Sequence, residues 1–143
     1  MFEELFGPLI YVHVSRRDKV AQAVSLLKAE QSGLWHLAAD GSERQRTAPH
    51  AQPTYDADRI ADLIGELERD DASWGAFFAA NGITPVQIEY EALAAEPNLQ
   101  VQKILSGLNL PAKLTEAIKA GTAKMADAGS SAWIERFRQE RCM

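Results

Sequence analysis

Residues 9–33, LIYVHVSRRDKVAQAVSLLKAEQSG, decide the fold of this chain. The apolar run at residues 9–14 is rich in β-branched side chains and predicts a strand buried on both faces of a parallel sheet. A charged break follows at residues 16–18. Apolar residues then recur at helical spacing over residues 19–31, and Gly33 is the expected helix stop. A strand, a short junction and a helix form the first part of an α/β unit.

The rest of the sequence predicts more helix than strand. Residues 56–80 carry a long helical pattern, and residues 86–90 (VQIEY) form a second predicted strand. Helical segments broken at Pro97 come next, and residues 130–138 predict a terminal helix with a serine cap. The polar segment 37–53 contains Gly, Ser and Pro without periodicity, so we expect a flexible loop there.

The number of predicted strands is too small for a complete sheet. Two parallel strands do not make a stable sheet by themselves, because they leave both edges and both faces without neighbours. We therefore expect a missing strand, either one that the pattern does not reveal or one that lies outside this chain. The fold class that follows is α/β, mostly helical with a small parallel sheet.

Two arginines lie where the first strand turns into the first helix. A helix N-terminus carries a partial positive charge, so Arg16 and Arg17 are unfavourable there unless an anion binds. Backbone N–H groups and an arginine fork together make a phosphate site. Ser25 lies eight residues after Arg17 and would add a hydroxyl donor. The alternative interpretation is a solvent-facing pair of arginines bridged to Asp18.

This arrangement resembles the motif with which sulfotransferases hold the 3′-phosphate of the donor 3′-phosphoadenosine 5′-phosphosulfate (PAPS). The stretch SRRDKVAQAVSLLKAEQSGLWH at residues 15–36 is similar to the bacterial trehalose 2-sulfotransferase family. Two further stretches resemble sulfotransferase segments: IEYEALAAEPNLQVQKILSGLNL at residues 88–110, and KMADAGSSAWIERF at residues 124–137. The resemblance covers the chain from about Phe6 to Phe137.

The resemblance assigns cofactor-binding residues to this chain but no catalytic residue. It implies that Arg17, then Arg16 and Ser25, hold the 3′-phosphate of PAPS or of adenosine 3′,5′-bisphosphate. It also implies that Lys124 closes over the donor nucleotide. By the same analogy, His36 lies near the acceptor and is the candidate substrate residue, although an exposed histidine with no role is the alternative.

The resemblance covers one half of a sulfotransferase. The loop that wraps the 5′-phosphosulfate, the proposed general base, part of the acceptor site and the central strand belong to an N-terminal half that nothing here matches. Residues 1–143 are therefore expected to be a single partial domain, an incomplete P-loop-like sulfotransferase fold that lacks its N-terminal strand.

Three functional hypotheses follow. The first is an enzyme lineage that moves sulfate from PAPS to a sugar hydroxyl, with the isolated chain inactive and binding adenosine 3′,5′-bisphosphate weakly. The second is a non-catalytic module that pairs with itself, or with a complementing chain, to cover an exposed strand edge. The third is that the chain is a fragment of a longer sulfotransferase.

Composition excludes several other classes of function. A net charge of −5 argues against a general nucleic-acid or membrane-surface binder. The single cysteine, Cys142, cannot form a disulfide within the chain, and three scattered histidines predict no metal site. Residues 1–19 have no basic n-region and no long apolar run, so they do not predict a signal peptide. We expect a cytoplasmic protein.

Overall fold

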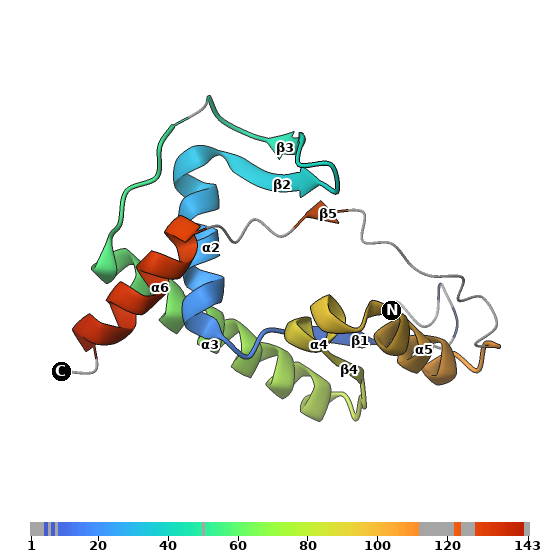
Figure 1. The fold of residues 1–143 in the computed structure, drawn as a ribbon. Coiled ribbons are helices and arrows are strands. Elements are labelled where there is room, and N and C mark those ends of the chain that lie inside the picture. Colours follow the sequence, from blue (N-terminus) through green and yellow to red (C-terminus); the bar gives the residue numbers. More distant parts are fainter. Residues whose placement is uncertain are drawn as a thin grey trace. The chain divides into compact units, whose positions relative to one another are not determined.

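The structure is a computed structural model, and it describes residues 5, 7, 9–49, 51–111, 122–123 and 128–141 (Figure 1). The chain forms two compact units: Met1–Arg17 with Asp71–Lys119, and Asp18–Asp70 with Ala120–Met143. In chain order, the helices and strands are β1 (Val12–Ser15), α2 (Lys19–Ser32), β2 (Leu34–Ala38), β3 (Glu43–Arg46), α3 (Ala57–Ala80), β4 (Val86–Glu89), α4 (Tyr90–Ala95), α5 (Pro97–Gly107), β5 (Thr122–Ala123) and α6 (Ala128–Arg141). Helix dominates, and the predicted α/β class with a small parallel sheet is confirmed.

The first unit is built on the parallel pair β1 and β4, which lie side by side in Figure 1. Val12 pairs with Val86, Ser15 pairs with Glu89, and the Val86 N–H donates to the Tyr11 carbonyl at 2.8 Å. Because the strands are parallel and in this register, both end at the same edge of the sheet. The segments that follow β1 and β4 therefore start next to each other.

Helices α4 and α5 follow β4 and pack beside it in the same unit. Pro97 starts α5, where its missing N–H has no helical partner to lose. Ile88 on β4 is only 1% exposed. A Cβ placed on Gly107, in the last turn of α5, would approach the Val86 Cγ2 to 2.8 Å. A side chain at this position would therefore push α5 away from the strand.

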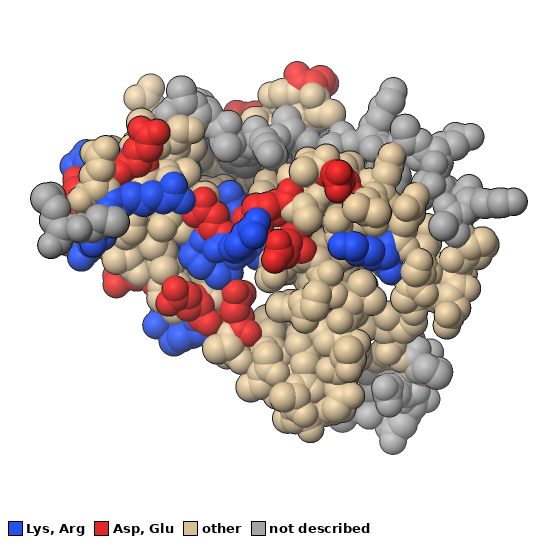
Figure 2. All heavy atoms as spheres, turned by 60° about the horizontal axis from the view of Figure 1, so that its bottom comes forward, with Lys and Arg blue, Asp and Glu red and all other residues tan. Residues whose placement is uncertain are grey.

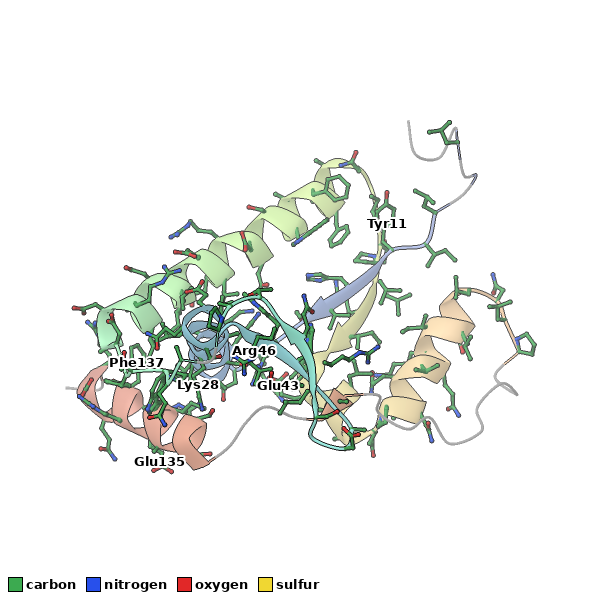
Figure 3. The ribbon with its side chains drawn as sticks, turned by 90° about the horizontal axis from the view of Figure 1, so that it is seen from above. Tyr11, Lys28, Glu43, Arg46, Glu135 and Phe137 are labelled. Atoms are coloured by element: carbon green, nitrogen blue, oxygen red, sulfur yellow. The ribbon has the colours of Figure 1, made fainter. Side chains whose placement is uncertain are left out.

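Aromatic rings at the C-terminal end of α3 pack against the start of β1. Tyr11 lies 6.2 Å from Phe77 and 6.1 Å from Phe78, and His13 lies 5.4 Å from Phe78 in an edge-to-face arrangement. Figure 3 shows Tyr11 near the rings at this end of α3. Phe78 is buried, whereas Phe77 and Trp74 remain exposed. The C-terminal end of α3 therefore packs on the face of the β1–β4 sheet that carries Tyr11 and His13.

The prediction that the first strand is buried on both faces is wrong. Val12 is 40% exposed and Val14 is 55% exposed. Residues that alternate along a strand share one face of the sheet, so these two valines belong to the same face. In the described part of the chain the sheet has only two strands, and β1 has a neighbour along one edge only. The apolar face of β1 is therefore open to solvent.

The second unit has a helical core. Helices α2 and α6 pack against the N-terminal part of α3, and the core consists of Ala23, Val24, Leu27, Ile60, Leu63 and Phe137. The predicted helix over residues 19–31 is confirmed as α2, with Gly33 as its left-handed cap at φ 69°. The predicted helix over residues 56–80 is confirmed as α3, with the Asp56 carboxylate accepting the Arg59 N–H at 2.9 Å.

A β-hairpin occupies part of the segment that was expected to be a loop. Strands β2 and β3 are antiparallel, and β2 also pairs with β5 to make a three-stranded sheet. Asp40 and Gly41 turn the chain between them, with Gly41 at φ 83° and the Asp40 carboxylate accepting the Ser42 N–H. The expected loop over residues 37–53 is thus wrong for residues 37–38 and 43–46, which lie in β2 and β3. The strand β3 was not apparent from the sequence, because ERQR is polar throughout and has no apolar alternation.

The terminal helix α6 begins before the predicted start at residue 130. Ser130 is buried, and its hydroxyl accepts a hydrogen bond from the Lys28 Nζ at 2.9 Å. The serine therefore joins α6 to α2 rather than capping the helix. Among the described residues, no helix combines the length and apolar character needed to cross a membrane.

Candidate functional site

The candidate site lies at the carboxyl ends of β1 and β4 in the first unit. Arg16 and Arg17 follow β1 directly, and Tyr90 follows β4 as the first residue of α4. Parallel pairing of the two strands brings these segments together although 74 residues separate them in sequence. The carboxyl ends of parallel strands are where α/β sheets bind their ligands.

Arg16 is held against the segment that follows β4. Its guanidinium carbon lies 4.6 Å from the centroid of the Tyr90 ring, within range of a cation–π interaction. The Glu91 Oε1 lies 3.9 Å from the Arg16 Nε. The side chain is 22% exposed, and its Nε is buried with no hydrogen-bond partner in the described residues. Arg16 is therefore restrained in position while a charged donor stays unused.

Arg17 is arranged differently from Arg16. Its side chain is 73% exposed, and its Nη2 lies 3.8 Å from the Glu89 Oε2. Its backbone N–H donates to the Glu91 Oε2 at 3.3 Å. The two arginines thus have different carboxylates near their guanidinium groups. Neither separation is short enough for a hydrogen bond, so both forks keep their donors for another acceptor.

The acidic neighbours of the two arginines differ from the one that the sequence suggested. Glu89 and Glu91 lie nearest in the first unit, and their two charges balance those of the arginines. In the second unit, Asp18 caps α2 by accepting the Ala21 N–H at 3.0 Å and accepts a hydrogen bond from Arg138 at 2.9 Å. Figure 2 agrees with this mixture of charges: basic and acidic side chains lie side by side on the face that it displays.

Ser25 lies in α2 of the second unit and is partly buried. Within the described residues, its hydroxyl has no hydrogen bond, so it does not bond back to a helix carbonyl as an interior serine commonly does. Arg16 and Arg17 belong to the first unit, whereas Ser25 belongs to the second. Each part carries hydrogen-bond donors that no described residue uses.

The remaining predicted site residues lie elsewhere. His36 is exposed on β2, opposite Gln45 in the hairpin register, and no described residue forms a hydrogen bond or an ion pair with its side chain. Lys124 lies outside the described residues. The described residues contain no cluster of three or more His, Cys, Asp and Glu side chains that suits a metal ion.

No role in the site was assigned to Tyr90 and Glu91 from the sequence. A signal was available, because residues 86–90 were predicted as a strand parallel to the first. The ends of parallel strands share an edge, so residues that directly follow each strand are expected to meet. Two arginines follow one strand, and the end of the other carries the acidic residues Glu89 and Glu91, so the charges of the two segments are opposite.

Comparison with known proteins agrees with the strand-junction-helix motif. A family model described as Stf0 sulphotransferase matches residues 1–140. The chain belongs to the Stf0 sulphotransferase family. The resemblance of residues 15–36, 88–110 and 124–137 to sulfotransferases is thereby confirmed at the level of the family.

Two curated relatives of this Stf0 family chain are named trehalose 2-sulfotransferase. The one from Mycobacterium tuberculosis is 32% identical over 131 residues, and the one from Mycolicibacterium smegmatis is 30% identical over 131 residues. Each alignment covers 92% of this chain and 46% of the relative. The chain thus spans about half the length of the curated relatives that it matches.

Proposed function

We propose that this chain provides the 3′-phosphate-binding part of a PAPS-dependent sulfotransferase site. The observation that carries the proposal is the junction after β1, where Arg16 and Arg17 have guanidinium donors that no described residue accepts. Ser25 adds an unused hydroxyl eight residues further along the chain. In the sulfotransferase family these residue types at this spacing hold the 3′-phosphate.

The residues fit a phosphate group. A guanidinium fork donates parallel hydrogen bonds to phosphate oxygens, and neither Arg16 nor Arg17 donates a side-chain hydrogen bond to a described residue. Glu89 and Glu91 oppose the anion by their charge. Glu89 lies 3.8 Å from the Arg17 Nη2 and Glu91 lies 3.9 Å from the Arg16 Nε, so neither carboxylate takes a direct guanidinium hydrogen bond that a phosphate could accept. Bound PAPS would supply the sulfonate group for transfer, with Arg16 and Arg17 holding its 3′-phosphate.

The acceptor and the transfer step are proposed from the relatives. Trehalose 2-sulfotransferases act on a sugar, so a sugar hydroxyl is the acceptor that we propose for the lineage. No residue of this chain is assigned as the general base or as the loop around the 5′-phosphosulfate. We therefore expect adenosine 3′,5′-bisphosphate binding without sulfate transfer by the chain alone. His36 and Lys124 stay candidates for the acceptor and nucleotide contacts.

The test is calorimetric titration of the chain with adenosine 3′,5′-bisphosphate. Arg17→Ala is expected to weaken binding about tenfold or more, the size of a lost charge-assisted hydrogen bond. Arg44→Ala, on β3 of the second unit, is the matched control for the loss of one positive charge and should bind as the wild type does. Absence of binding in the wild type, or equal binding in both variants, would contradict the proposal.

A second function is favoured by the open apolar face of the first unit. Val12 and Val14 are exposed on the same face of β1. We propose that a complementing polypeptide, equivalent to the half of the relatives that this chain does not match, adds a strand beside β1 and covers this face.

We also propose that the protein acts in the cytoplasm, where a single cysteine stays reduced.

Light scattering of the chain, with and without the unmatched half of a trehalose 2-sulfotransferase, tests this second function. A complex of the two polypeptides that Val14→Lys abolishes is expected, because a lysine cannot be buried unpaired. If the chain instead forms a homodimer that Val14→Lys converts to a monomer, the partner on this face is a second copy of the chain and not a complementing polypeptide. A monomer that binds nothing in either form would contradict the proposal.

A further inference from the structure

We propose that Tyr90 is a positioning residue that orients Arg16 for the phosphate, an inference that rests on the proposed donor site. The sequence ranked Arg17 above Arg16 by its spacing to Ser25. The structure distinguishes the two arginines by their surroundings. Arg16 is 22% exposed and stacked on an aromatic ring, whereas Arg17 is 73% exposed.

The stacking restrains Arg16 without using its hydrogen bonds. A guanidinium 4.6 Å from a ring centroid is attracted to the face of the ring, and its N–H groups stay free at its edges. The buried Nε has no hydrogen-bond partner in the described residues. An arginine that is already ordered loses less side-chain entropy when it binds a phosphate than an exposed one does.

Glu91, the residue after Tyr90, lies close to both arginines. It accepts the Arg17 backbone N–H at 3.3 Å, which holds its carboxylate at the junction. From there its Oε1 reaches to 3.9 Å from the Arg16 Nε, a separation that attracts the guanidinium without forming a hydrogen bond. Tyr90 thus supplies a flat surface for Arg16, and Glu91 supplies a charge at one edge of the guanidinium.

The inference predicts energetic coupling between Tyr90 and Arg16. We would titrate adenosine 3′,5′-bisphosphate into the wild type, Tyr90→Leu, Arg16→Ala and the double variant. Tyr90→Leu is expected to weaken binding about fivefold, the scale of one cation–π contact. In the Arg16→Ala background the same change should have no further effect. Tyr90→Phe keeps the ring and should bind as the wild type does.

Two outcomes of the cycle would overturn the inference while leaving the donor site intact. An equal loss on Tyr90→Leu with and without Arg16 would mean that the ring contacts the nucleotide itself. A loss in Tyr90→Phe as large as that in Tyr90→Leu would mean that the hydroxyl group is responsible. Thermal melting of each variant shows that it is folded before it is titrated.

A measurement without ligand separates failure of the inference from failure of the proposed function. The Arg16 Nε–H resonance should carry a ring-current shift that Tyr90→Leu removes and Tyr90→Phe preserves. Absence of that shift in the wild type would overturn the stacking itself. A normal shift in a protein that does not bind adenosine 3′,5′-bisphosphate would overturn the proposed function and leave Tyr90 with a structural role only.

Discussion

Arg138 donates a hydrogen bond from Nη2 to the Asp18 Oδ2 at 2.9 Å, across 120 residues of sequence. Asp18 is the N-cap of α2, and its other oxygen accepts the Ala21 N–H at 3.0 Å. One carboxylate therefore begins α2 and holds the C-terminal part of α6 against it. Both side chains are more than a third exposed, so the helix cap contributes more to stability than the ion pair.

Asp18→Ala is expected to lower the free energy of unfolding by about 1–2 kcal/mol, because the cap and the Arg138 contact are both lost. Asp18→Asn keeps an oxygen for the Ala21 N–H and should cost less. Urea denaturation measures both variants. A cost for Asp18→Asn as large as that for Asp18→Ala would show that the charge, and not the cap, is the main contribution.

Gly33→Ala is expected to destabilise the second unit by about 2 kcal/mol or more. Gly33 has a φ of 69°, which costs a side chain about 1–2 kcal/mol, and a Cβ there would lie 2.6 Å from the Ala48 backbone N. Gly82→Ala is the matched control, with a φ of 63° and nothing within 4 Å of the added Cβ. Equal costs in thermal or urea unfolding would show that the clash with Ala48 relaxes without effect.

Stability should fall in acid through Glu140. Hydrogen bonds from Tyr55, at 2.7 Å, and Arg136, at 2.8 Å, lower the pKa of the Glu140 carboxyl below its usual value. A lowered folded-state pKa contributes stability above the unfolded-state pKa, and this contribution is lost as the pH falls through the folded-state value. The melting temperature should therefore drop below a pH of about 4.5.

Glu140→Gln is expected to reduce this acid sensitivity, because the amide does not titrate. Some sensitivity should remain, since hydrogen bonds from Ser42 also lower the pKa of Asp40. The test measures the melting temperatures of the wild type and the variant between pH 3 and pH 7, at intervals of about one pH unit. An unchanged acid limb in Glu140→Gln would assign the loss to other carboxyl groups.

Ile88→Ala and Val14→Ala test how the two strands of the first unit are covered. Ile88 is 1% exposed, so its truncation should cost about 2–5 kcal/mol. Val14 is its partner in the sheet register but is 55% exposed, and truncation there should cost about 0.5 kcal/mol or less. A large loss for Val14→Ala in urea unfolding would show that its face is covered in solution.

The fold could be predicted from the sequence where the pattern is local. Periodicity and end signals predicted α2 and α3. Gly33, the predicted stop of the first of these helices, is the left-handed C-cap of α2. The hairpin β2–β3 was not predictable in the same way, because its second strand, ERQR, buries neither face and so carries no alternation. The strand forms because its backbone pairs with β2, and the side chains of β3 carry no sign of this pairing.

The candidate site was predicted in part. The motif from Arg16 to Ser25 is contiguous, so the sequence alone pointed to a phosphate and to the sulfotransferase family. The sequence does not show which of the two arginines is held in place by its neighbours. Arg16 and Arg17 have the same chemistry, and only their contacts with Tyr90, Glu89 and Glu91 distinguish them.

By itself, the sequence determined the long helices α2 and α3 and the two strands β1 and β4, because each depends on residues that lie close together along the chain. Only the tertiary structure decided that Tyr90 stacks on Arg16 and that Val14 stays exposed while Ile88 is buried. Both depend on the register of β1 against β4, which joins segments more than 70 residues apart. Parallel pairing fixes which side chains meet at the sheet edge, and no local pattern encodes that choice.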